Sequence, residues 1–78
     1  MKQIADNKVA SLKLLLVDSI FQYAQDKRMT QKTLAETLGT SQPRISNMLR
    51  YDLSKFSLDT LFKYVYDLDI RVKINVGE

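Results

Sequence analysis

The stretch Gly39-Thr-Ser-Gln-Pro-Arg-Ile-Ser46 decides how the middle of this chain folds. It lies within a region whose apolar residues recur at helical spacing, yet it contains a glycine and the chain's only proline. A proline inside a helix costs about 3 kcal/mol, whereas the first turn tolerates it because the N–H groups there have no intrahelical partner. We therefore expect one short helix to end before Gly39 and a second to begin after Ser41.

Each of these two short helices has its own N-cap and its own apolar face. Thr30 is the expected N-cap of the first helix, over about 31–38, and Ser41 is that of the second. The expected buried positions are Leu34, Ala35, Leu38, Ile45, Met48 and Leu49. Two short helices joined by a tight turn with glycine are typical of a helix-turn-helix unit, which we place at about residues 30–50.

A longer helix is expected on the N-terminal side, over about residues 7–27, with Asp6 or Asn7 as its N-cap. Its apolar face consists of Val9, Leu12, Leu16, Ile20 and Tyr23. A second apolar stripe beside the first consists of Leu14, Leu15, Val17 and Phe21. A helix with so wide an apolar surface is expected to have partners on both sides.

Two further elements are expected after the helix pair. Ser57 is the expected N-cap of another helix, whose apolar residues are Leu58, Leu61, Phe62, Val65 and Leu68. Residues 70–76 alternate strictly between apolar and polar, which is the period of a half-buried strand. The sequence thus predicts a single, mainly α domain over residues 1–78, with four to five helices and a C-terminal β-strand.

The composition excludes several kinds of chemistry. The chain contains neither cysteine nor histidine, so it offers no zinc site, no thiol nucleophile and no imidazole base. Its nine acidic residues are scattered along the chain. We therefore expect no enzyme activity, no metal and no cofactor. Because no apolar run approaches about 20 residues, we expect no membrane span and a cytoplasmic location.

The positive charge is concentrated around the helix pair. From Arg28 to Lys55 there are five basic and two acidic residues, a net charge of +3, whereas the rest of the chain has seven of each. A solvated surface would account for such a surplus. Beside a helix-turn-helix, however, a basic segment also favours nucleic acid as a partner.

The run Thr30-Gln-Lys-Thr-Leu-Ala-Glu-Thr-Leu-Gly-Thr-Ser-Gln-Pro-Arg-Ile-Ser-Asn-Met-Leu49 resembles the helix-turn-helix of the phage repressor and Cro-like family, also called the XRE family. Lys55-Phe-Ser-Leu-Asp-Thr-Leu61 extends this resemblance. The strand-like tail is similar to a subgroup that includes HigA-like antitoxin regulators. The resemblance covers about residues 8–76 and implies a repressor-like fold. It also implies binding to double-stranded DNA, with the second short helix, the recognition helix, in the major groove.

The resemblance implies roles for individual residues. The expected base contacts are Gln42, Pro43, Arg44 and Asn47. Arginine suits guanine, glutamine and asparagine suit adenine, and proline offers only apolar contact, for example to a thymine methyl group. The expected phosphate contacts are Gln31, Lys32, Ser41, Arg50 and Lys55. Ser41 as a cap alone, and Lys32 as a solvated surface lysine, are the alternatives for those two residues.

Three residues, at two places in the chain, depart from the family pattern. Tyr51-Asp52 stands where the family usually has a glycine, often followed by a basic residue, and Asp69 stands where it tends to have a glycine. Asp52 would repel a phosphate if it faced DNA. A phosphate contact through the Tyr51 hydroxyl, or a longer recognition helix, would account for the first departure.

The predicted strand needs a partner, because a single strand cannot satisfy its own backbone groups. The same segment of a second copy is the nearest candidate, which predicts a homodimer. The expected dimer interface consists of Ile70, Val72, Ile74, Val76, Leu14, Val17 and Phe21. A strand that folds back on its own domain, or that frays, is the alternative.

Three functions are compatible with this sequence. The leading hypothesis is a sequence-specific transcriptional regulator that represses a promoter as a homodimer on a near-palindromic operator. The second is an antitoxin that binds a toxin protein and also regulates its own operon. The third is an interaction module that has lost DNA binding, and the basic surplus around the recognition helix argues against it.

Overall fold

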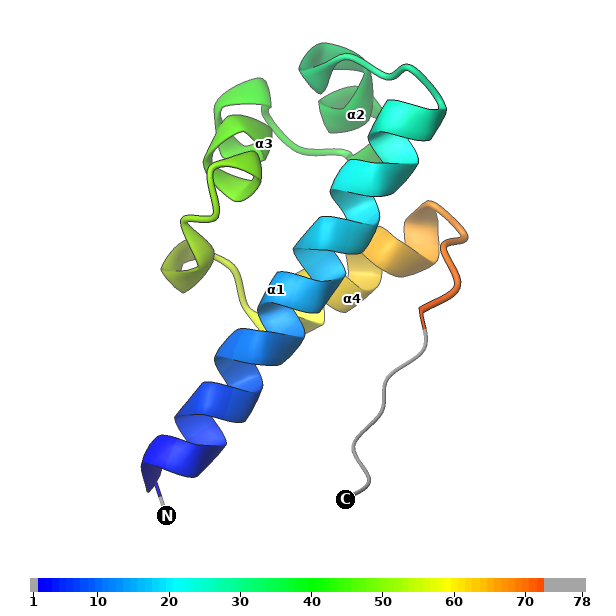
Figure 1. Cartoon of the computed structure of the whole chain (residues 1–78). Helices are drawn as coiled ribbons and strands as arrows, with labels where there is room; N and C mark the ends of the chain where they lie inside the picture. Colours follow the sequence, from blue (N-terminus) through cyan, green and yellow to red (C-terminus); the bar gives the residue numbers. More distant parts are fainter. Residues whose placement is uncertain (1, 73–78) are drawn as a thin grey trace.

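The computed structural model describes residues 2–72, with side chains from Lys8 onward. Within this range the chain forms α1 (Lys2–Asp26), α2 (Gln31–Leu38), α3 (Gln42–Leu49), the 3-10 helix η1 (Leu53–Lys55) and α4 (Leu58–Asp67) (Figure 1). The long helix α1 packs mainly against α4 and also contacts α3 and η1. In Figure 1, α3 and η1 lie on one side of α1, and α4 lies on the other. The helix pair predicted for residues 30–50 is therefore confirmed as α2 and α3.

One apolar core joins the four α-helices. Its side chains are Leu16, Val17, Ile20, Ala24, Leu34, Ala35, Leu38, Ile45, Met48, Phe56, Leu61, Tyr64, Val65 and Leu68. Among residues 8–72 no polar or charged side chain other than the Tyr64 phenol belongs to the buried set. Burial of a Leu, Ile or Phe side chain contributes about 1.5–3 kcal/mol, so this core supplies most of the drive for folding.

The N-caps predicted for the three shorter α-helices are confirmed. The hydroxyl of Thr30 accepts a hydrogen bond from the Thr33 N–H at 3.0 Å. The hydroxyl of Ser41 accepts from the Arg44 N–H at 3.3 Å, and that of Ser57 accepts from the Thr60 N–H at 3.1 Å. Pro43 lies in the first turn of α3, where it sacrifices no intrahelical hydrogen bond.

All four α-helices end in the same way, with a residue in the left-handed region. These residues are Arg28, Gly39, Tyr51 and Asp69, with φ between 56° and 69°. After each one, the next N–H donates to the carbonyl five residues before it, as Thr40 does to Ala35 at 2.9 Å. This hydrogen bond closes the helix end. Tyr51 and Asp69 therefore adopt the backbone conformation that the family glycines would supply, and α3 does not run longer.

Three expectations about the helices need correction. Helix α1 begins at Lys2, so Asp6 and Asn7 lie inside it and do not cap it. Val17 is fully buried in the core of its own chain and cannot belong to a dimer interface. The apolar periodicity placed Val17 on the second apolar stripe of this helix. Periodicity shows that a stripe is covered, but it does not show whether a helix of the same chain or a second copy covers it. Phe62, expected on the inner face of α4, is 39% exposed.

The predicted strand over residues 70–76 is not found in the part that the structure describes. Residues 70–72 have no regular secondary structure, and Ile70 and Val72 pack, partly buried, against the core. Ile74 and Val76 lie outside the described residues. Across residues 2–72, no helix combines the length and the apolar character needed to cross a membrane.

Gly39→Val should lower the free energy of unfolding by more than about 1 kcal/mol, because a β-branched residue is poorly tolerated at positive φ. A Cβ atom at Gly39 would contact nothing within 4 Å, so the cost comes from the backbone conformation and not from a clash. Arg28→Gly, at the corresponding end of α1, should change the stability in the opposite direction. Denaturant titration measures both effects. A Gly39→Val variant as stable as the parent would contradict this account of the turn.

Candidate nucleic-acid interface

The turn between α2 and α3 fixes the direction in which α3 leaves the core. Gly39 ends α2 at φ 69°, and Ser41 returns to extended backbone at φ −92° and ψ 154° before α3 begins. Ile45 and Met48 then hold the inner face of α3 in the core, while Ala35 is the small buried residue of α2. This geometry leaves the N-terminal end of α3 on the surface.

The residues predicted to contact DNA are all at least partly accessible. Gln42 and Pro43 are exposed at the start of α3, whereas Arg44 and Asn47 are half-buried. The predicted phosphate contacts Gln31, Lys32, Ser41, Arg50 and Lys55 are exposed. Because the Ser41 oxygen accepts the Arg44 N–H as a cap, its own O–H remains a donor for an external acceptor.

The guanidinium of Arg44, a predicted base contact, is held by two groups outside α3. Its guanidinium carbon lies 4.3 Å from the centroid of the Phe56 ring. Its Nη2 donates to the Lys55 carbonyl oxygen at 3.4 Å. Arg44 thus connects the first turn of α3 to the last residue of η1 and to the residue that follows it. Nothing in the sequence points to Phe56 as part of the site, because only its position beside α3 gives it this role.

Asn47 and Arg50 form a pair on the outer side of α3. Nη2 of Arg50 donates to Oδ1 of Asn47 at 2.7 Å. This contact orients the Asn47 amide, leaving its NH₂ group free to donate to a base or a phosphate. The two residues were predicted to have separate roles, and the structure brings them together.

Lys55 and Asp52 form a second exposed pair. Lys55 Nζ lies 3.3 Å from Asp52 Oδ2, and Ser54 Oγ donates to Asp52 Oδ1 at 3.3 Å. An exposed ion pair of this kind contributes only about 0–1 kcal/mol, so a phosphate can compete for the lysine. The pair also offsets the negative charge that made Asp52 unfavourable beside DNA.

Tyr51 links the end of α3 to α1. Its hydroxyl donates to Asp18 Oδ1 at 2.6 Å, across 33 positions in the chain. This hydrogen bond, with a smaller effect of desolvation and of the Asp18 charge, raises the pKa of Tyr51 above its ordinary value of 10.0. The Tyr51 hydroxyl is therefore directed to α1, which does not support the idea that it replaces the family's phosphate contact. Nothing in the sequence points to Asp18 as its partner.

Tyr51→Phe should make the free energy of unfolding less sensitive to alkaline pH. The folded protein holds the Tyr51 proton more tightly than the unfolded chain does, so this stabilisation is complete below about pH 10 and is lost as the pH rises through the folded pKa. Denaturant titrations from about pH 8 to about pH 11.5 measure the slope. Tyr66→Phe, at an 83% exposed side chain, is the matched control. Equal slopes for the parent and Tyr51→Phe would show that the pair with Asp18 does not form.

The chain is similar to known proteins in sequence and in fold. A solved structure titled "Putative XRE Family Transcriptional Regulator" matches with a TM-score of 0.81 at 29% sequence identity, covering 94% of this chain and 82% of that chain. Comparison with curated proteins gives no match. The family described as "Helix-turn-helix domain" matches residues 1–77, a range that includes α2, the turn at Gly39 and α3. The chain therefore belongs to the helix-turn-helix domain family.

Proposed function

We propose that the protein is a transcriptional regulator that binds double-stranded DNA and does not act as an enzyme. The observation that carries this proposal is the placement of α3. The turn and the Ser41 cap orient this helix so that its N-terminal residues lie on the surface. A helix with its side chains is about 10–12 Å across, which suits a major groove about 12 Å wide. The similarity to a chain titled as a transcriptional regulator supports the same function.

In this proposal the residues of α3 read bases and the residues around it contact phosphates. Gln42 and Asn47 suit adenine, Arg44 suits guanine, and Pro43 suits a thymine methyl group. Phosphate contacts come from Gln31, Lys32, Ser41, Arg50 and Lys55. They fix the position of the helix without reading the sequence. The net charge of +3 between residues 28 and 55 attracts DNA to this part of the surface.

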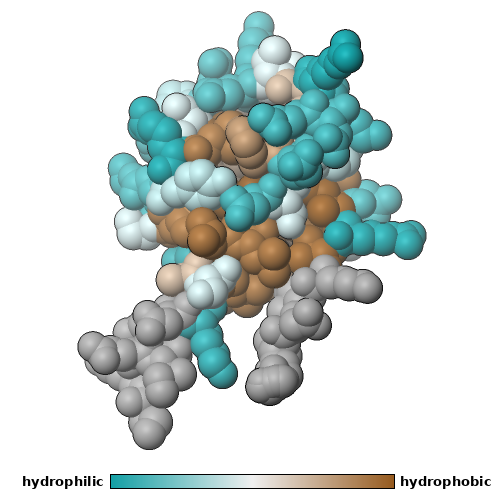
Figure 2. Space-filling model, in the orientation of Figure 1, coloured by the Kyte–Doolittle hydropathy of each residue, from teal (hydrophilic) through white to brown (hydrophobic). Residues whose placement is uncertain are grey.

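We further propose that the protein acts as a homodimer that represses a promoter by occupying a near-palindromic operator. Exposed apolar side chains support an interface between copies: Leu14 is 44% exposed and Phe21 is 38% exposed on α1, and Phe62 and Tyr66 are exposed one turn apart on α4. Figure 2 shows apolar surface in the middle of this face, with hydrophilic side chains above it and at its sides. Ile70 and Val72, which the core of their own chain buries only in part, complete the proposed interface. A dimer would place two copies of α3 in successive major grooves, about 34 Å apart.

An antitoxin that regulates its own operon would use α3 in the same way. The exposed apolar residues Phe62 and Tyr66 would then suit a toxin protein as well as a second copy. Co-expression with the product of a neighbouring gene, followed by co-purification, separates this alternative from a regulator that acts alone. An interaction module without DNA binding would leave the basic segment around α3 without a role.

Arg44→Ala should weaken binding to a specific duplex by about 1–3 kcal/mol and relax the preference at one base pair. Lys55→Ala, a contact with phosphate, should weaken specific and random duplexes alike and reduce the salt slope by about one unit. Selection of duplexes from a random library by the parent protein supplies the specific sequence. A parent that selects no sequence would contradict the proposed function, and an unchanged salt slope would remove Lys55 from the interface.

Truncation after Asp69 should convert the protein to a monomer and weaken its binding to the selected duplex. The physical reason is that the truncation removes the apolar segment of the proposed interface, including Ile70 and Val72, which their own core buries only in part. Sedimentation and DNA titration measure the two effects on the same sample. A truncated protein that remains dimeric and binds with unchanged affinity would exclude this segment from the interface.

A further inference from the structure

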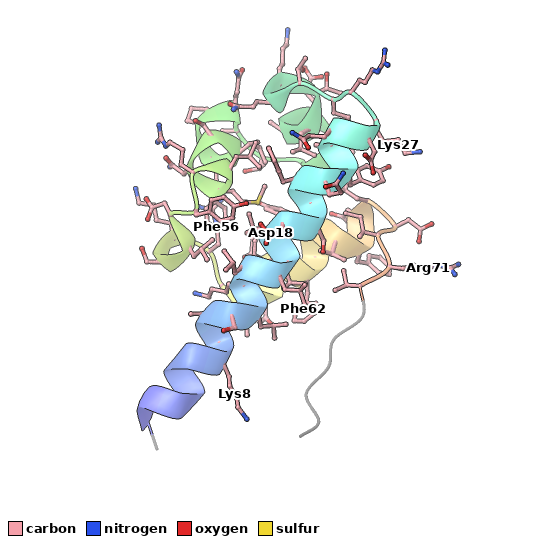
Figure 3. The ribbon with its side chains drawn as sticks, in the orientation of Figure 1. Lys8, Asp18, Lys27, Phe56, Phe62 and Arg71 are labelled. Atoms are coloured by element: carbon pink, nitrogen blue, oxygen red, sulfur yellow. The ribbon has the colours of Figure 1, made fainter. Side chains whose placement is uncertain are left out.

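Two groups outside α3 hold the guanidinium of Arg44. The guanidinium carbon Cζ lies over the ring of Phe56, 4.3 Å from the ring centroid, and the Lys55 carbonyl accepts a hydrogen bond from Nη2 at 3.4 Å. Phe56 is only 1% exposed, so the core fixes its ring, and the guanidinium of Arg44 lies against a fixed surface. Figure 3 labels Phe56, which lies between α3 and α1.

The remaining donors of Arg44 are not enclosed by the protein. No buried nitrogen or oxygen on the described side chains lacks a hydrogen-bond partner, so a guanidinium nitrogen without a partner in the protein must be accessible. A guanidinium has five N–H donors arranged in two forks, and one bond from Nη2 uses a single hydrogen. One fork of two parallel donors therefore remains available on the surface beside the start of α3.

We propose that Phe56 and the Lys55 carbonyl are positioning groups that present Arg44 to DNA as a pre-ordered fork. Phe56 would then contribute to sequence specificity without touching DNA. The fork matches two adjacent acceptors, such as O6 and N7 of a guanine in the major groove. A flexible arginine loses rotamer entropy when it binds, whereas a stacked one has already lost part of it. This inference rests on the proposed function and assigns one of its contacts.

If Phe56 positions Arg44, substitution of Phe56 should weaken binding to a specific duplex more than binding to a scrambled duplex. The measured quantity is the ratio of affinities for a duplex selected by the parent protein and for a scrambled duplex of the same composition. Phe56→Leu keeps an apolar side chain in the core but removes the aromatic face, and it should lower this ratio about fivefold or more. Arg44→Ala should lower the ratio at least as far. In the Arg44→Ala background, Phe56→Leu should produce no further loss, because the group that it positions is gone.

A matched control separates positioning from a general loss of stability. Leu61→Val removes a methylene from a fully buried residue of α4 and should leave the ratio unchanged while lowering stability to a similar extent. Phe56→Met replaces Phe56→Leu if the latter does not fold. NMR of the free protein gives an independent readout: the Arg44 side-chain protons should be shifted upfield by the Phe56 ring in the parent and not in the Phe56 variant.

The outcomes are distinguishable. A Phe56→Leu variant that keeps the parent ratio, or a parent without the ring-current shift, would overturn the inference and leave the proposed function intact. An Arg44→Ala variant that loses affinity equally for both duplexes would make Arg44 a phosphate contact and would also overturn the inference. A parent protein that prefers no sequence would overturn the proposed function together with this inference.

Discussion

The backbone between Leu38 and Gln42 is the constraint on which the rest of the structure depends. Leu34, Leu38, Ile45 and Leu49 would lie on one face of a continuous helix, so the apolar pattern alone does not require a break. An unbroken helix over residues 31–49 would be about 28 Å long. The two shorter dimensions of the domain are only 23 Å and 17 Å. The left-handed Gly39 and the Ser41 cap fold the second half back instead. The start of α3 becomes a surface only because of this turn.

The position of the recognition helix also depends on groups far from it in the chain. Tyr51 donates to Asp18 on α1 at 2.6 Å, and Lys13 Nζ of α1 donates to the Leu53 carbonyl at 3.3 Å. Arg44 of α3 itself lies over the ring of Phe56, which follows η1. A single hydrogen bond contributes only about 0.5–1.5 kcal/mol, but together these contacts fix the segment that follows α3. The helix-turn-helix is therefore held at its turn by local backbone chemistry and at its far end by tertiary contacts.

Sequence reasoning succeeded where the physical signal is local. Thr30, Ser41 and Ser57 are capping residues whose hydrogen bonds span three positions, and Gly39 marks a conformation that few other residues favour. It failed where the outcome depends on distant groups. Val17 is buried by helices that periodicity could not locate, and the Tyr51–Asp18 pair joins residues 33 positions apart. For the site, the motif predicted which residues of α3 are accessible. It could not predict that Arg44 lies against Phe56, because side-chain stacking leaves no pattern in the sequence.

Binding of DNA to the surface around the start of α3 is tested most directly by an NMR titration of the ¹⁵N-labelled protein with a selected duplex. We expect the largest amide shift changes at residues 31–32, 41–47 and 55, with small changes on the outer face of α4 apart from any due to dimerisation. Shift changes confined to α4, or spread evenly over the domain with none at the start of α3, would contradict this account.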